Sequence, residues 1–131
     1  LVAAGYSAVD SVNAFSVVRY NNNGVLDSSF GSNGRVFISV GGGGLISGVG
    51  GYLKSRNKNI KMYGVSPENS CVMYESLKAG KQLDLPSKET LSDGTAGGVE
   101  IGSITFKLCQ DIIDDFILVN ESEIAAGIRS Q

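Results

Sequence analysis

Four consecutive glycines, Gly41 to Gly44, separate an apolar, β-branched segment from a segment with helical periodicity. Residues 36–40 are rich in β-formers, which predicts a strand. Over residues 44–56 the apolar side chains recur at helical spacing, which predicts a helix. Glycines without Cβ atoms let successive backbone amides point at one oxyanion, and the N-terminus of a following helix adds its own free amides. The junction therefore predicts a phosphate-binding turn, although the glycines alone are equally consistent with a simple tight turn.

Downstream of the glycines, segments of strand character alternate with segments of helical periodicity. Such alternation is typical of a mostly parallel sheet with helices packed on it. We therefore expect an α/β fold, with a small, mostly parallel sheet flanked by helices. The expected strands are residues 36–40, 60–65 and 116–119, and the expected helices are residues 44–56, 70–78 and 103–114, with a last helix that Asn120 caps.

The first 35 residues have the composition of strands and turns. Residues 14–20 are rich in β-formers, and the Asn-Asn-Asn-Gly run at 21–24 favours a turn because Asn and Gly tolerate positive φ. We expect this N-terminal β-hairpin segment to extend or cover an edge of the parallel sheet. A parallel core that lacks neighbouring strands also favours association, so we expect a homo-oligomer formed through exposed sheet edges.

The composition removes several functional classes. The 131 residues include no histidine, which excludes a Ser-His-Asp triad, a Cys-His pair and a histidine-ligated zinc site. The formal net charge of −2 indicates no nucleic-acid surface, and no apolar run reaches the ~20 residues of a membrane span. Cys71 and Cys109 have no metal-like spacing, so we expect two small buried residues in a reducing compartment. A disulfide between them is the alternative. The acids at 111–115 fit a solvated helix end better than a cation site.

The segment Val-Gly-Gly-Gly-Gly-Leu-Ile-Ser-Gly at 40–48 resembles the phosphate loop of threonine and serine dehydratases and serine racemases, which are fold-type-II enzymes that use pyridoxal phosphate (PLP). Further segments resemble the same family in the same order: residues 60–69, 73–81, 90–96 and 114–124. The resemblance implies that PLP is the cofactor and that the backbone of Gly41, Gly42, Gly43, Gly44 and Leu45 holds its phosphate, with Gly94 near its ring. Otherwise phosphate or sulfate would occupy the loop.

Several family features are absent from the sequence. The lysine that bonds the cofactor lies in a Ser-Phe-Lys-x-Arg-Gly motif upstream of the loop, and the chain contains neither that motif nor the Ser-x-Gly-Asn-His segment. Ser66 replaces the glutamate that holds a divalent cation in related racemases. The family's partner for the pyridine nitrogen would lie beyond Gln131. We therefore expect an incomplete dehydratase-like domain, inactive alone, with no catalytic or metal residues. The alternative is a structural or oligomerising domain without a ligand.

Residues 14–36 resemble one unit of the delta-60 repeat, which occurs in tandem in large, propeller-like bacterial proteins. A single unit cannot bury its own face. The resemblances divide the chain into a delta-60-like β segment at 1–35 and a partial PLP-enzyme domain at 36–131. Two families in one short chain favour a recombined or engineered chimera over a natural fusion or truncated reading frame. The first part implies an extracellular origin and the second a cytoplasmic one, so the location of the whole chain stays open.

Overall fold

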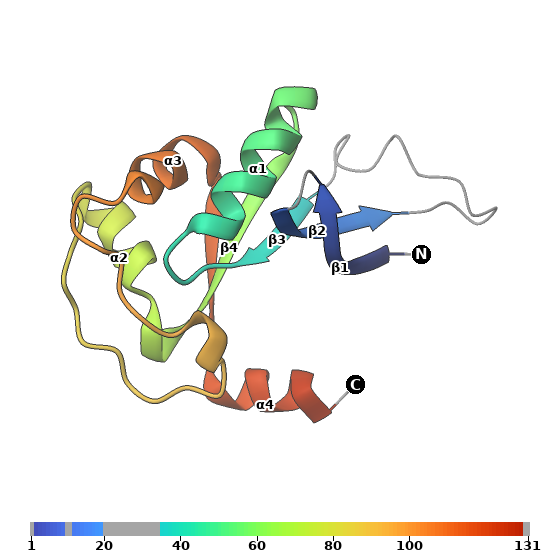
Figure 1. The fold of residues 1–131 in the computed structure, drawn as a ribbon. Coiled ribbons are helices and arrows are strands. Elements are labelled where there is room, and N and C mark those ends of the chain that lie inside the picture. Colours follow the sequence, from blue (N-terminus) through green and yellow to red (C-terminus); the bar gives the residue numbers. More distant parts are fainter. Residues whose placement is uncertain (1, 10–11, 20–34, 130–131) are drawn as a thin grey trace.

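The computed structural model describes residues 2–9, 12–19 and 35–129 (Figure 1). Strands β1 (Val2–Val9) and β2 (Val12–Arg19) form an antiparallel hairpin with Val2 opposite Arg19. This confirms the N-terminal β-hairpin segment of the predicted fold. Within the described residues the hairpin is a two-stranded sheet of its own and does not extend the parallel sheet by hydrogen bonds. The turn predicted at 21–24 lies outside the described residues.

The second sheet contains β3 (Arg35–Ser39), β4 (Lys61–Pro67) and β5 (Asp115–Val119) in that order. Both pairings are parallel, with Phe37 opposite Tyr63. Each strand is adjacent in the sheet to the next strand in the chain. Because the paired strands are parallel, each pair is connected by a crossover that contains helix. The predicted α/β class and the parallel arrangement are confirmed.

The helices agree closely with the periodicity of the sequence. The first helix has the predicted bounds, and Gly80 ends the second in a left-handed conformation at φ 70°. The long connection at 81–98 stays irregular apart from a single 3-10 turn. The helical elements are α1 (Gly44–Arg56), η1 (Glu68–Ser70), α2 (Val72–Ala79), η2 (Asp93–Thr95), α3 (Ile104–Ile112) and α4 (Glu121–Arg129).

One face of the parallel sheet forms the hydrophobic core with α1, α2 and α3. Alternate residues of β3 point into it, and α1 lies against α3 so closely that Gly50 meets Ile112. The opposite face is more open to solvent: Phe37 is 53% exposed and Ile117 is 39% exposed there. The core residues are Val36, Ile38, Val40, Ile46, Ile60, Met62, Val72, Met73, Val99, Cys109 and Ile112. Among the described residues, no helix has the length and apolarity needed to span a bilayer.

Candidate phosphate site

The residues Gly41 to Gly44, here called the glycine loop, connect the C-terminal end of β3 to α1 (Figure 1). Ligands of open α/β sheets bind at the C-terminal ends of the strands. Gly43 has a left-handed φ of 84°, and a Cβ there would lie 2.7 Å from Cys109 Sγ and 2.7 Å from Met73 Cε. Both the backbone conformation and the packing therefore require glycine at this position.

The other glycines of the loop divide into one that is hemmed in and two that are open. A Cβ on Gly41 would lie 3.0 Å from the backbone oxygen of Thr95. Gly42 and Gly44 are exposed, and a Cβ on either would have no neighbour within 4 Å. The loop is thus packed against other residues at Gly41 and Gly43. Gly42 and Gly44 are exposed to solvent.

The N-terminus of α1 has no cap of its own. Gly43 supplies no capping side chain, and the first turn of α1 contains no acidic residue. The amide of Ser47 donates to the carbonyl of Gly43 at 3.0 Å, so the amides of the preceding helical residues lack intrahelical acceptors. A helix end of this kind attracts an anion through its free N–H groups and its dipole.

Helix α4 shows the contrast. Its N-terminus is closed by Asn120, whose side-chain oxygen accepts from the amide of Glu123 at 3.0 Å. Glu123 returns a carboxylate oxygen to the amide of Asn120 at 2.9 Å. This reciprocal capping box satisfies the α4 terminus within the chain. The α1 terminus lacks this closure, and so does α2, where Cys71 makes no side-chain capping hydrogen bond.

The residues expected to bind the cofactor lie at two separate points of the chain. Leu45 is the second residue of α1 and is 38% exposed, next to the open amides of the glycine loop. Gly94 lies in the 3-10 turn η2. Its neighbour Thr95 approaches Gly41 through the backbone, so the segment that contains Gly94 does pack against the glycine loop.

Cys109 of α3 supports the loop from beneath, a role that sequence reasoning did not find. Its Sγ atom lies 3.8 Å from the carbonyl oxygen of Gly43 and 3.5 Å from Ser47 Oγ. Burial raises the pKa of the Cys109 thiol, although the hydrogen bond with Ser47 opposes the shift. The thiol is therefore neutral near pH 7 and acts as a small packing group. Cys109 is buried as expected, whereas Cys71 is only half-buried, and both thiols are free.

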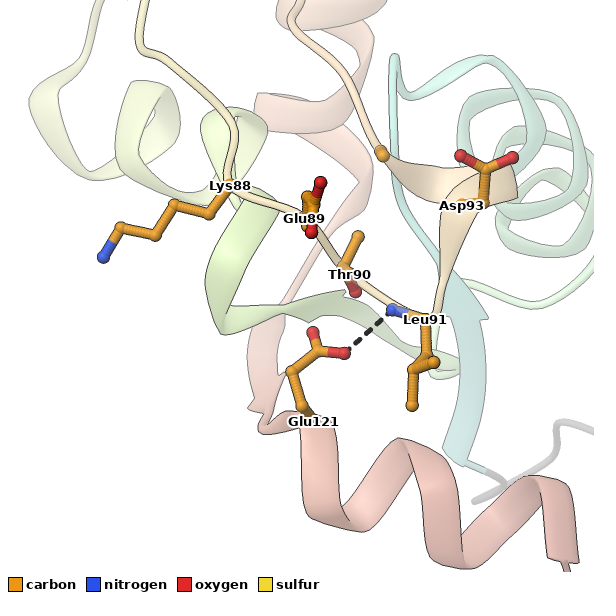
Figure 2. A pocket seen from close by; sticks show the side chains of 7 residues that line it. Lys88, Glu89, Thr90, Leu91, Asp93 and Glu121 are labelled. Atoms are coloured by element: carbon orange, nitrogen blue, oxygen red, sulfur yellow. Dashed lines mark hydrogen bonds between the residues drawn. The ribbon is translucent and has the colours of Figure 1, made fainter.

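A cavity of about 420 Å³ lies between the irregular connection and the start of α4 (Figure 2). Glu121 Oε2 accepts a hydrogen bond from the amide of Leu91 at 2.8 Å. This amide, helped by the hydroxyl of Thr90, holds the pKa of Glu121 below its usual range against the opposing effect of burial. Glu121 thereby ties α4 to the segment that leads into η2. The cavity is lined by Lys88, Glu89, Thr90, Leu91, Asp93, Ala96 and Glu121.

The acids at the end of α3 do not form a cation site. Asp114 forms ion pairs with Lys54 at 2.7 Å and with Lys61 at 3.3 Å. It also accepts a hydrogen bond from the amide of Met62 at 2.8 Å. Partial burial acts to raise the pKa of Asp114, but Lys54, the Met62 amide and Lys61 together hold it below its usual range. The carboxylate is therefore engaged in joining α1 and β4. No group of three or more acidic or cysteine side chains within residues 35–129 could hold a metal ion.

A model of the pyridoxal-phosphate dependent enzyme family matches residues 25–130. The chain belongs to this family. Mitochondrial threonine dehydratase of Saccharomyces cerevisiae is 41% identical over 96 residues, which are 73% of this chain and 16% of the yeast protein. The structure of processed threonine deaminase isoform 2 from Solanum lycopersicum superposes with a TM-score of 0.68 at 41% identity, over 72% of this chain and 27% of that one. Maize serine racemase gives a TM-score of 0.67 at 32% identity, over 72% and 29%.

The match to the pyridoxal-phosphate dependent enzyme family covers only part of each relative, and a second family model matches the N-terminal residues. The chain spans less than a third of each of these three relatives. A second model, a domain of unknown function described as a beta-propeller, matches residues 1–30 and overlaps the first match. That match is compatible with the propeller-like repeat predicted for the N-terminal residues.

Proposed function

We propose that this chain is a partial threonine/serine dehydratase-like domain whose glycine loop binds a phosphate monoester, with PLP as the ligand in the family. The observation that carries the proposal is that the N-terminus of α1, which the four glycines lead into, has no side-chain cap. Gly42 and Gly44 expose their backbone, and no acidic side chain occupies the first turn of the helix. A phosphate there would take the place of the missing cap.

The residues of the loop fit the phosphate of PLP. The amides of Gly41 to Gly44 and of Leu45 would hold the phosphate, and Gly94 would lie near the ring, as the family resemblance implies. When bound, PLP supplies an electron sink for reactions at the α-carbon of an amino acid. The part of the site formed by this chain binds and orients through backbone groups, so it adds no side chain that moves a proton.

Catalysis by the chain alone is not expected under this proposal. The sequence contains no Ser-Phe-Lys-x-Arg-Gly motif and no histidine. A covalent bond to PLP needs a lysine that its surroundings position and tune. Two lysines near the sheet, Lys54 and Lys61, are both engaged with Asp114. We therefore propose that the chain releases no ammonia from serine or threonine, and an ammonia assay of the purified chain tests this directly.

One observation favours a structural role as the second candidate. Parallel sheets are normally covered on both faces, yet Phe37 and Ile117 are exposed on the face opposite α1 and α3. A non-catalytic, oligomerising domain without a ligand would use this surface or the sheet edges. We also propose that residues 1–35 and 36–131 are separate units joined as a chimera, which sequencing of the source gene across residues 20–40 would test.

A calorimetric titration of the whole chain with PLP and, separately, inorganic phosphate tests the main proposal. Gly42→Asp is the informative variant, because its side chain meets no neighbour yet places a carboxylate at the open amides. Gly48→Asp is the matched control, since Gly48 is exposed on α1 and equally free of neighbours, one turn beyond those amides. Saturable binding that Gly42→Asp abolishes and Gly48→Asp largely retains is expected. A folded chain that binds neither ligand would favour the structural role.

A further inference from the structure

The peptide that enters the glycine loop is held by a single side chain. Ser66 of β4 donates from its hydroxyl to the carbonyl oxygen of Val40 at 2.7 Å, and both residues are almost completely buried. The amide of Val40 donates to the carbonyl of Val65 at 2.8 Å. Both backbone groups of the residue immediately before Gly41 are therefore fixed to β4.

The hydroxyl of Ser66 substitutes for a backbone donor that the sequence removes. In a parallel ladder, a residue whose amide donates to residue 65 has a carbonyl that accepts from residue 67. Position 67 is Pro67, which has no N–H. The carbonyl of Val40 would remain buried without a partner if Ser66 did not supply one. The pair Ser66–Pro67 thus ends the ladder while keeping its last acceptor satisfied.

This hydrogen bond also determines the direction of the first donor in the loop. The peptide between Val40 and Gly41 is planar and trans, so its C=O and its N–H point in opposite directions. When Ser66 holds the Val40 oxygen toward β4, the Gly41 amide points away from β4. In the direction that a Cβ would take, Gly41 is confined by the backbone of Thr95.

We propose that Ser66 is a positioning residue for the glycine loop, because its hydroxyl replaces the missing amide of Pro67 and so orients the Gly41 amide for a phosphate. This inference rests on the proposed phosphate-binding function. The Ser66 side chain would then contribute to anion affinity without touching the anion, by fixing the peptide that precedes the loop.

The test compares Ser66→Ala with a rescue variant and a matched control. Ser66→Ala should weaken the binding of inorganic phosphate and of PLP about tenfold, measured by calorimetry. The double variant Ser66→Ala/Pro67→Ala restores a backbone N–H at position 67 and should recover most of that affinity. Ser76→Ala is the control, since Ser76 is also fully buried and its hydroxyl accepts from the Leu83 amide at 3.0 Å. It should lower the melting temperature and leave the affinity unchanged.

A second readout separates failure of this inference from failure of the phosphate-binding proposal. Amide hydrogen exchange and ¹⁵N shifts of Gly41 and Gly42 in the ligand-free chain should change in Ser66→Ala, return in the double variant and stay constant in Ser76→Ala. If wild type binds no phosphate but these shifts behave as described, the binding proposal and the role of Ser66 in anion affinity fail, while the orientation of the loop backbone by Ser66 stands. Unchanged loop shifts in a folded Ser66→Ala chain, or an equal loss of affinity in Ser76→Ala, would overturn the inference.

Discussion

Cys109 Sγ lies 3.8 Å from the carbonyl oxygen of Gly43, so α3 contacts the N-cap residue of α1. A Cβ on Gly43 would lie only 2.7 Å from the same sulfur. The conformation of the glycine loop is therefore coupled to the packing of α3. Substitutions at the loop should consequently affect stability as well as ligand binding.

Gly43→Ala should destabilise the chain by about 1–3 kcal/mol, because alanine would adopt an unfavourable left-handed φ and collide with Cys109 and Met73. Gly42→Ala is the control, since its Cβ meets nothing within 4 Å, and its effect should stay within about 0.5 kcal/mol. Urea denaturation followed by circular dichroism measures both. Equal stability of the two variants would show that Gly43 is not under the constraint described.

Two glycines on α1 should respond in opposite directions to alanine. A Cβ on Gly50 would lie 2.5 Å from Ile112 Cγ2 and 3.2 Å from Met62 Cε, so Gly50→Ala should cost about 1–3 kcal/mol through overpacking. Gly48 has no neighbour, so Gly48→Ala should stabilise α1 by about 0.5–1 kcal/mol through helix propensity alone. Thermal unfolding of both variants distinguishes these effects. A stabilising Gly50→Ala would contradict the close packing of α1 on α3.

Asp114 should make stability depend on pH in the acidic range. Its folded-state pKa is lowered, so its contribution is present above the unfolded-state pKa of about 4 and is lost as the pH falls through the folded value. Asp114→Asn should therefore be less stable than wild type at pH 7 by about 1 kcal/mol, because the contacts are partly solvated. The difference should shrink as the pH falls through the lowered folded-state pKa of Asp114 and vanish once the carboxyl is protonated in both states. Asp111→Asn, which alters an exposed acid on α3, should show no such difference at either pH.

Glu121→Gln should loosen the segment between residues 90 and 93. The carboxylate accepts the Leu91 amide at 2.8 Å, and its lowered pKa keeps it ionised at neutral pH. Hydrogen exchange of the Leu91 amide should therefore be faster in the variant at pH 7. In wild type, protonation below about pH 4 should weaken the same protection. Glu89→Gln, at an exposed position that also lines the cavity, should leave the exchange at Leu91 unchanged.

Local chemistry in the sequence was sufficient to predict the helices. The bounds of α1 follow from apolar periodicity after the glycines. Ser103 is a residue type that favours N-cap positions, and its hydroxyl accepts from the Thr105 amide at 3.3 Å. The cap at Asn120 was also predicted, because its side chain and the acids that follow are a start signal readable from neighbouring residues.

The contacts that support the glycine loop could not be predicted in this way. Thr95 and Cys109 reach the loop only after α3 and η2 fold back on the sheet, and neither residue type carries a local signal for that approach. Ser66 is different, because proline at the next position marks the end of a ladder whose last acceptor needs another donor. Pro67 is visible in the sequence, but only the register of β3 against β4 shows that the acceptor left without a donor is the carbonyl of Val40.

The order of the parallel sheet has a consequence for inheritance. β3, β4 and β5 are consecutive both in the chain and in the sheet, so no other strand of the described residues lies between them. The supports described for the loop, from Ser66 to Cys109, also lie between the first and last of these strands. One continuous stretch of the chain therefore contains both the glycine loop and the residues that support it. A genetic rearrangement that moved this stretch would transfer it as a single portable unit, whatever segment it was joined to.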